Sequence, residues 1–238
     1  MKTELIYKLN AIKNLLYKNP SVIKTLYILK LNYRVFKLIK LAEKRKIKIK
    51  WCYYIFNNRL QYLFFTYYLI STISTIKYKD TDLIMFLQKD KLKILILYKM
   101  QDPHNLASCI RSAEAFGFDF LILTTKDTTK ITTLINNFSH ATSIFLPIFL
   151  TKNIRKTLSL LKKKQIKIFG FSVKASEMIN YVNIDESCAI IMGSEKYGIT
   201  PFIAKQCDLL YKIPTLGLCD SINVSVATGI IMYKLTYQ

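Results

Sequence analysis

The sequence predicts an α/β protein whose sheet is mostly parallel and carries helices on both faces. Two observations support this class. After residue 90, five short apolar runs recur along the chain, and segments with helical spacing lie between them. The runs are almost continuously hydrophobic, which is typical of parallel strands that are buried on both faces. A hydrophobic content of 51% is ample for the core that such a sheet requires.

The first 50 residues predict a smaller α/β unit of their own. The expected order is a helix, a strand, a basic amphipathic helix and a strand, at Leu5–Tyr17, Thr25–Leu29, Tyr33–Lys46 and Ile47–Trp51. Pro20 follows the first helix closely and is expected to end it.

An uncharged stretch, Leu60–Ile76, is the one candidate for a membrane span. It is slightly short for a span and contains Gln, Ser and Thr, so a buried strand with its flanks is the better interpretation. Polarity then rises, which places the domain boundary after this stretch. We expect a small domain at residues 1–76, a linker at 77–91 and a second domain at 92–238.

The second domain alternates strands and helices. The expected strands are Leu92–Leu97, Phe118–Leu123, Ile166–Phe171, Ala189–Met192 and Leu209–Ile213. The expected helices are Leu106–Phe116, Ile154–Lys164, Ile199–Gln206 and a final helix at Val224–Lys234. Strands separated by helices indicate parallel crossovers.

The net charge of +21 comes from 36 basic and 15 acidic residues, and the first 50 residues hold 14 basic residues against two acidic ones. A field of this sign attracts polyanions such as nucleic acid. An AT-rich genome would also encode many Lys, Ile, Asn, Tyr and Phe residues, so charge alone leaves both explanations open.

Cysteine and histidine usage argues against a metal site. The five cysteines are widely spaced, with no C-x-x-C pair, and His104 and His140 are the only histidines. No signal peptide opens the chain. We therefore expect reduced thiols, a cytoplasmic protein, no bound metal and no membrane association.

Three segments carry polar residues where strands give way to helices. The first, DPHNLASCIRSAEAFG, places Asn105 at a helix start and Arg111 six residues later. Asp or Asn there can cap the helix. If the helix is packed, Arg111 needs a polar or anionic partner nearby.

The second segment, IIMGSEKYGIT, ends an apolar strand at Gly193 and continues through Glu195 and Gly198. Ligands of α/β sheets bind beyond the carboxyl ends of strands, where glycine permits close approach of the backbone. Taken alone, this pattern is a weak signal, because a plain strand-to-helix turn with glycine caps is the commoner explanation.

The third segment, IPTLGLCDSINVSVATGI, leads from Ile213 past Gly217 into a helix of small and apolar residues. Ser221 or Asn223 can be a simple helix cap. The apolar run that follows predicts that the final helix is buried.

Together and in this order, the three segments resemble the motifs of the SpoU (TrmH) family of RNA ribose methyltransferases, in the SPOUT superfamily. The family's Asn-x5-Arg pattern matches Asn105 and Arg111, and its Gly-x-Glu-x-x-Gly element matches Gly193 to Gly198. Its closing element matches Ile213 to Ala227, with Ile222 in place of Leu. Residues 7–50 also resemble, more weakly, the ribosomal-protein-like domain of a branch that methylates a guanosine of 23S rRNA.

The resemblance implies methyl transfer from S-adenosylmethionine to a ribose 2′-hydroxyl of RNA, most directly rRNA. It implies that Arg111 acts at the reacting hydroxyl, as general base or as phosphate anchor, with Asn105, Glu195, Ser221 and Asn223 orienting it. It further implies that the cofactor lies against Gly193, Ile213, Gly217 and Ile222, that the C-terminal segment forms a trefoil knot, and that the protein is a homodimer with an RNA-binding N-terminal domain. A tRNA methylase of the same family and a non-catalytic RNA-binding or ribosome-assembly factor are the alternatives.

Overall fold

A computed structural model describes residues 2–52, 69–75, 78, 82–128, 133–181, 186–218 and 221–237. The chain divides into two compact units. The first comprises Met1–Ile76 together with Ile131–Ile144, and the second comprises Lys77–Lys130 and Phe145–Gln238. The chain thus returns once to the first unit after it has entered the second.

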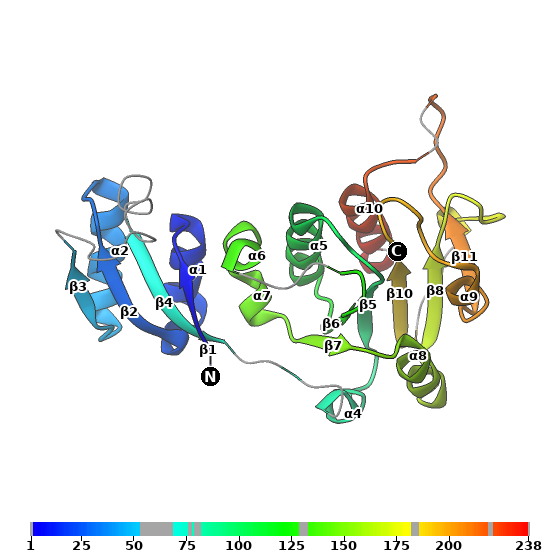
Figure 1. The fold of residues 1–238 in the computed structure, drawn as a ribbon, viewed down its shortest axis with the longest axis horizontal. Coiled ribbons are helices and arrows are strands. Elements are labelled where there is room, and N and C mark those ends of the chain that lie inside the picture. The colour runs from blue at the N-terminus through cyan, green and yellow to red at the C-terminus, as the bar shows by residue number, and fades with distance from the viewer. Residues whose placement is uncertain are drawn as a thin grey trace. The chain divides into compact units, whose positions relative to one another are not determined.

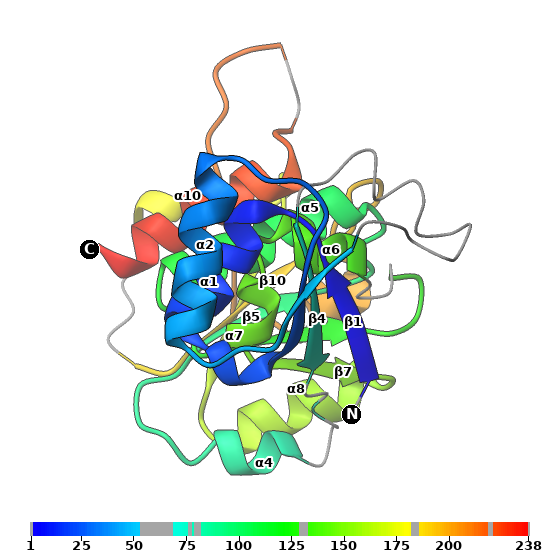
Figure 2. The same cartoon turned by 90° about the vertical axis from the view of Figure 1, so that its left-hand side faces the viewer.

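The first unit is built on a four-stranded sheet in the order β1-β4-β2-β3. Its strands are β1 (Lys2–Ile6), β2 (Ile23–Ile28), β3 (Ile49–Trp51) and β4 (Leu69–Thr75). Strand β4 pairs antiparallel with β1 and β2, and β3 pairs parallel with β2. Helices α1 (Leu9–Lys18) and α2 (Tyr33–Lys44) and the 3-10 helix η1 (Pro20–Val22) also belong to this unit. Helices α1 and α2 lie side by side (Figure 2).

The expected helix Leu5–Tyr17 begins too early. Leu5 and Ile6 belong to strand β1, where they pair with Thr72 and Ser71 of β4. Helix α1 starts only at Leu9, and its buried face continues the apolar spacing that predicted it. Residues 69–75 of the uncharged stretch form a strand, as expected, and residues 60–68 lie outside the described part of the chain.

A second missed feature is the segment at residues 133–144, with α6 (Thr133–Phe138) and α7 (Thr142–Phe145). The buried Asn137 accepts hydrogen bonds from the backbone N–H groups of Tyr7 (2.8 Å) and Lys8 (3.0 Å) and donates one to the Leu5 carbonyl (3.1 Å). One amide therefore satisfies the backbone where β1 gives way to α1, a position without regular pairing.

The second unit contains a seven-stranded sheet in the order β7-β6-β5-β10-β8-β11-β9, and every pair in it is parallel. Its strands are β5 (Lys93–Leu97), β6 (Phe120–Thr124), β7 (Ile148–Thr151), β8 (Lys167–Phe171), β9 (Glu177–Met178), β10 (Cys188–Met192) and β11 (Leu209–Lys212). The mostly parallel α/β prediction is confirmed, although β7 and β9 were not expected.

Helices cover both faces of this sheet (Figure 1). Side chains of α4 (Leu83–Phe86), α8 (Ile154–Lys163) and α9 (Pro201–Ala204) share one buried cluster with Ile94 and Ile96 of β5. Helices α5 (Pro103–Ala115) and α10 (Val224–Thr236) pack on each other over the opposite face. The remaining element is the 3-10 helix η3 (Ile179–Tyr181). Helix α4 falls within residues 77–91, so this segment contributes Leu83 and Leu87 to the core of the second unit.

None of the described helices is long and apolar enough to cross a membrane.

Candidate functional site

The three polar segments all follow carboxyl ends of strands in the parallel sheet. One joins β5 to α5, another joins β10 to α9, and the third joins β11 to α10. Strands β5 and β10 are neighbours, and only β8 separates β10 from β11. Carboxyl ends of parallel strands share one edge, which is where α/β sheets bind their ligands.

Glu195 links the second segment to the first. Its carboxylate accepts hydrogen bonds from the backbone N–H groups of Gln101 and Asp102, both at 3.2 Å, and from the Asn105 amide at 3.4 Å. A carboxylate acceptor strengthens such bonds relative to a neutral one. Glu195 thereby fixes the turn that leads into α5.

Asn105 links the first segment to the third. Its side-chain oxygen accepts a hydrogen bond from the Asn223 amide at 3.1 Å, and its own amide reaches Glu195. Asn223 also caps α10 by accepting from the backbone N–H of Ser225 at 2.8 Å. The structure therefore joins Asn105, Glu195 and Asn223 in one relay of side chains from three segments.

The Glu195 loop is a closed turn. Ser194 and Gly198 exchange two backbone hydrogen bonds, of 3.1 and 2.9 Å, and Gly198 has the left-handed φ of 62° that favours glycine. A Cβ at Gly193 would lie 2.0 Å from the Gly198 carbonyl carbon. Gly193 is therefore required by the close approach of two backbone segments, and Gly198 is favoured by its left-handed φ. The closed turn presents Glu195 at its tip.

Helix α5 places Arg111 away from that relay. Asp102, rather than Asn105, caps the helix by accepting from the His104 N–H at 2.9 Å. The buried face carries Asn105, Leu106, Cys109, Ile110 and Ala113, whereas Arg111 is exposed. Among the described residues, no side chain bonds to Arg111. The expected packing of α5 is present, but it involves the opposite side of the helix, so the guanidinium needs no protein partner.

Cys109 lies at the contact between α5 and α10. Its thiol is 3.6 Å from the Thr228 hydroxyl, and the residue is fully buried. Burial raises the pKa of Cys109 to about 12, the Thr228 hydrogen bond opposes that rise, and the Glu195 charge adds to it. A thiol held protonated in this way packs as a small apolar group.

The residues expected to hold the cofactor are spread over two of the segments. Gly193 is buried, Ile213 and Ile222 are half-buried, and Gly217 is exposed in a loop that extends away from the second unit in both views (Figures 1 and 2). Leu216 and Leu218 of this loop are fully exposed. Ser221 is also exposed, and no other described residue bonds to it, so the structure does not bring it to the relay.

The loop has the groups that an adenine nucleoside would require. Within the described part of the chain, the peptide groups of residues 214–218 form no hydrogen bonds and are free to pair with ring nitrogens and hydroxyls. The exposed leucines supply an apolar surface for a flat ring. These residues therefore fit a nucleoside cofactor. No group of three His, Cys, Asp or Glu side chains among the described residues is placed to hold a metal ion.

Sequence reasoning missed the backbone N–H groups of Gln101 and Asp102 as anchors of Glu195. Backbone donors leave no signal in the residue types, and only the register of the turn brings them together.

Comparison with known proteins finds RNA methyltransferases of one family. Residues 93–233 match the model of the SpoU rRNA Methylase family. A protein of Blochmanniella floridana named 23S rRNA (guanosine-2'-O-)-methyltransferase RlmB is 29% identical over 99% of this chain and 95% of its own length. A protein of the same name from Coxiella burnetii is 34% identical over 61% of this chain and 58% of its length.

Solved structures share the fold at low sequence identity. The SpoU methyltransferase AviRb from Streptomyces viridochromogenes, in complex with AdoMet, covers 98% of this chain and 88% of its own, with a TM-score of 0.78 and 18% identity. An AdoMet-bound rRNA methyltransferase from Sinorhizobium meliloti covers 98% of this chain and 86% of its own, with a TM-score of 0.73 and 18% identity.

Proposed function

This chain belongs to the SpoU rRNA methylase family, and from that premise we propose that it methylates the ribose 2′-hydroxyl of a guanosine in 23S rRNA. The methyl donor is S-adenosylmethionine. The observation that carries the proposal is the relay of Asn105, Glu195 and Asn223, because it unites the family's three motifs at the ligand-binding edge of the sheet.

Each motif residue has a defined task in this proposal. S-adenosylmethionine, when bound, supplies an electrophilic methyl group on its sulfonium sulfur. Residues Gly193, Ile213, Gly217 and Ile222 hold it through backbone groups and apolar contact. Asn105, Glu195 and Asn223 fix the loops around the target nucleotide, and Ser221 contacts that nucleotide. Positioning of the two reactants is a large part of such catalysis.

Arg111 is assigned to the phosphate beside the target ribose. Guanidinium groups remain protonated across the ordinary pH range and bind phosphate oxygens through two donors at once. The exposure of Arg111 and its lack of an acidic partner among the described residues leave those donors available. Both observations favour the phosphate anchor over the general base.

The first unit is proposed to bind RNA through the outer face of α2. Tyr33 and Phe36 are exposed there, at 73% and 44%, and the ammonium groups of Lys37 and Lys40 lie 4.4 and 4.7 Å from the centres of these rings. Aromatic rings beside lysines are typical of surfaces on which unpaired bases stack. The role assigned to residues 1–76, with 77–91 leading to the methylase domain, rests on this face and on the basic composition.

A homodimer is part of the proposal. Helix α10 carries an exposed stripe at helical spacing, namely Val226, Ile230, Tyr233 and Tyr237. An apolar stripe on an otherwise packed helix is typical of a surface that a partner covers. We further propose that the C-terminal segment forms the family's trefoil knot. We also propose that the protein is cytoplasmic, because bacterial rRNA is made and modified in the cytoplasm.

The decisive experiment is transfer of tritiated methyl groups from S-adenosylmethionine to total RNA from a strain that lacks the protein, followed by mapping of the labelled nucleotide. Label in one guanosine of 23S rRNA is expected. Label in tRNA would keep the chemistry and contradict the substrate. If a folded protein labels no RNA, the methyltransferase function is refuted, and a non-catalytic RNA-binding or ribosome-assembly factor remains as the alternative.

A further inference from the structure

Basic residues concentrate on α8 and its flanks. Of the 18 Lys and Arg residues after residue 90, six lie within residues 152–164, and none of the ten acidic residues does. All six are exposed: Lys152, Arg155, Lys156, Lys162, Lys163 and Lys164. We call this set the α8 basic face. Drift in composition spreads lysine along a chain and does not gather it in one segment that lacks acidic residues.

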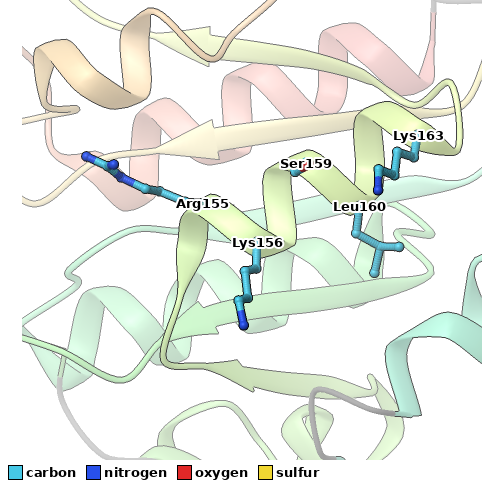
Figure 3. Close-up of a pocket in the computed structure, with 5 residues that line it drawn as sticks. All are labelled: Arg155, Lys156, Ser159, Leu160 and Lys163. Atoms are coloured by element: carbon cyan, nitrogen blue, oxygen red, sulfur yellow. The ribbon is translucent and has the colours of Figure 1, made fainter.

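The surface of the helix is hollowed between its basic ends. An open hollow of about 410 Å³ is lined by Arg155, Lys156, Ser159, Leu160 and Lys163. Figure 3 shows Arg155 at one end of the helix and Lys163 at the other, with Ser159 and Leu160 between them. Eight residues of helix separate Arg155 from Lys163, a rise of about 12 Å. The face is therefore an elongated track rather than a point site.

These cations have no acidic partners. Among the described residues, none of the six forms an ion pair, whereas Lys99 on the same unit pairs with Asp127 at 2.9 Å. Arg155 instead stacks on the ring of Phe202, 4.0 Å from its centre. Unpaired surface cations exchange only water and counterions when they meet a polyanion, and releasing those counterions drives binding.

The track begins at the edge of the sheet that holds the relay. Helix α8 follows β7, so its first turn lies at the carboxyl edge, and the helix then runs toward the amino edge. Phe202, the residue against which Arg155 stacks, follows the Glu195 segment by only a few residues. The track thus leads away from the site on the face opposite α5 and α10.

We propose that the α8 basic face binds the phosphate backbone of the RNA substrate, at nucleotides that flank the methylated one. This rests on the proposed function, because it names a second contact of the same substrate. RNA fits better than an acidic protein, because Arg155, Lys156 and Lys163 line the hollow at successive positions along the helix, as a chain of phosphates requires. Phosphate contacts of this kind position the substrate without reading its sequence.

The test removes two charges from the hollow. The affinity of the Lys156→Gln/Lys163→Gln variant for an unmodified 23S rRNA transcript is measured without cofactor at several salt concentrations. The slope of log affinity against log salt concentration should become shallower by about 1.4 to 1.8, the value for two lost phosphate contacts. The KM for this RNA rises, kcat stays unchanged, and calorimetry finds unchanged affinity for S-adenosylmethionine. Arg155 is left intact because its stacking on Phe202 also supports the fold.

Two controls make the result specific. The charge-conserving Lys156→Arg/Lys163→Arg variant should bind as the wild type does, and Lys234→Gln on α10 should change the slope by less than half as much. An unchanged slope in the glutamine variant, or an equal loss in either control, would overturn the proposal, and so would binding of acidic proteins with no effect on RNA. Binding is measured without methyl transfer, so the two proposals can fail separately. If the protein methylates no RNA but still binds RNA through the α8 basic face, the proposed function is refuted and the α8 proposal stands.

Discussion

Replacing Arg111 by alanine separates catalysis from folding at a single residue. The side chain is exposed and unpaired among the described residues, so Arg111→Ala should leave the melting temperature and the affinity for S-adenosylmethionine nearly unchanged. Methyl transfer should be abolished, because the anchor of the target nucleotide is lost. Arg111→Lys serves as the matched variant and should retain a small part of the activity, since it keeps the charge but loses the bidentate geometry. Turnover at the wild-type rate in Arg111→Ala would refute the assignment.

Two glycines of the second unit should respond to alanine in opposite directions. Gly193→Ala places a methyl group against the Gly198 carbonyl and should lower the free energy of unfolding by about 1–3 kcal/mol. Cofactor affinity should fall with it, because the Glu195 loop must shift.

Gly229 of α10 has open space where its Cβ would lie. Gly229→Ala is the control and should raise stability by about 0.5–1 kcal/mol through helix propensity. Chemical denaturation measures both changes, and an equally tolerated Gly193→Ala would contradict the close approach.

The buried thiols should resist alkylation. Burial raises the pKa of Cys109 to about 12 and that of Cys188 to about 11, and in Cys188 the Lys93 charge opposes this rise. Because the thiolate is the reactive form, labelling by iodoacetamide at about pH 8 should be very slow in the folded protein and should accelerate only as the pH rises toward these values. Peptide mass mapping, with guanidinium-unfolded protein as reference, measures this. Equal rates in the folded and unfolded protein would show that these thiols are accessible.

At the residue level, the sequence identified the polar partners but not all of their geometry. The resemblance to the family's motifs predicted that Asn105, Glu195 and Asn223 belong to one site at the strand ends, and hydrogen bonds join all three. Arg111 could not be placed, because helical spacing tells which residues share a face but not which face the sheet covers. Ser221 follows a segment, residues 219–220, that lies outside the described chain, and its predicted role remains a proposal.

Helix α10 carries the proposed dimer contact. Two residues of its exposed stripe, Tyr233 and Tyr237, form an aromatic cluster with Phe116. The ring centres of the two tyrosines are 5.2 Å apart. Ile230→Glu would bury a charge in that contact and should convert a dimer into a monomer, which analytical ultracentrifugation would detect. Lys234→Glu on the same helix is the control, because Lys234 lies outside the stripe. A wild-type protein that is monomeric at micromolar concentration would refute the contact.

At the level of elements, apolar runs were the reliable signal. All five strands expected after residue 90 are present, because a strand buried on both faces needs a continuous hydrophobic run. The missed strands gave weaker signals. Strand β9 has only two residues, and β1 was hidden inside a pattern that also fits the following helix. Strand β7 is apolar, but it has only four residues and directly follows Pro147. Helices α6 and α7 are short and rich in Asn, Ser and Thr, residues that favour turns when no tertiary partner is known.

For the whole molecule, the return of residues 131–144 to the first unit affects whether the second unit can be produced without the first. The boundary after residue 76 predicts that the methylase part can be produced alone. Yet Asn136, Asn137 and Ser139 are buried within the first unit, and Asn137 pairs with the backbone of Leu5, Tyr7 and Lys8. A chain of residues 77–238 would expose these groups together with the apolar side chains around them.

We therefore expect the 77–238 chain to be less stable than the full protein and prone to aggregation. Loss of a buried, fully paired amide alone costs about 1–3 kcal/mol, and several such groups lose their partners at once. Asn137→Ala in the full-length protein isolates one of these contacts and should lower the melting temperature while leaving the α5, α9 and α10 segments in place. Circular dichroism on heating and light scattering provide the measurements. If the 77–238 chain stays monodisperse and melts at the temperature of the full protein, then the segment at 131–144 folds without the first unit, and the simpler boundary after residue 76 holds.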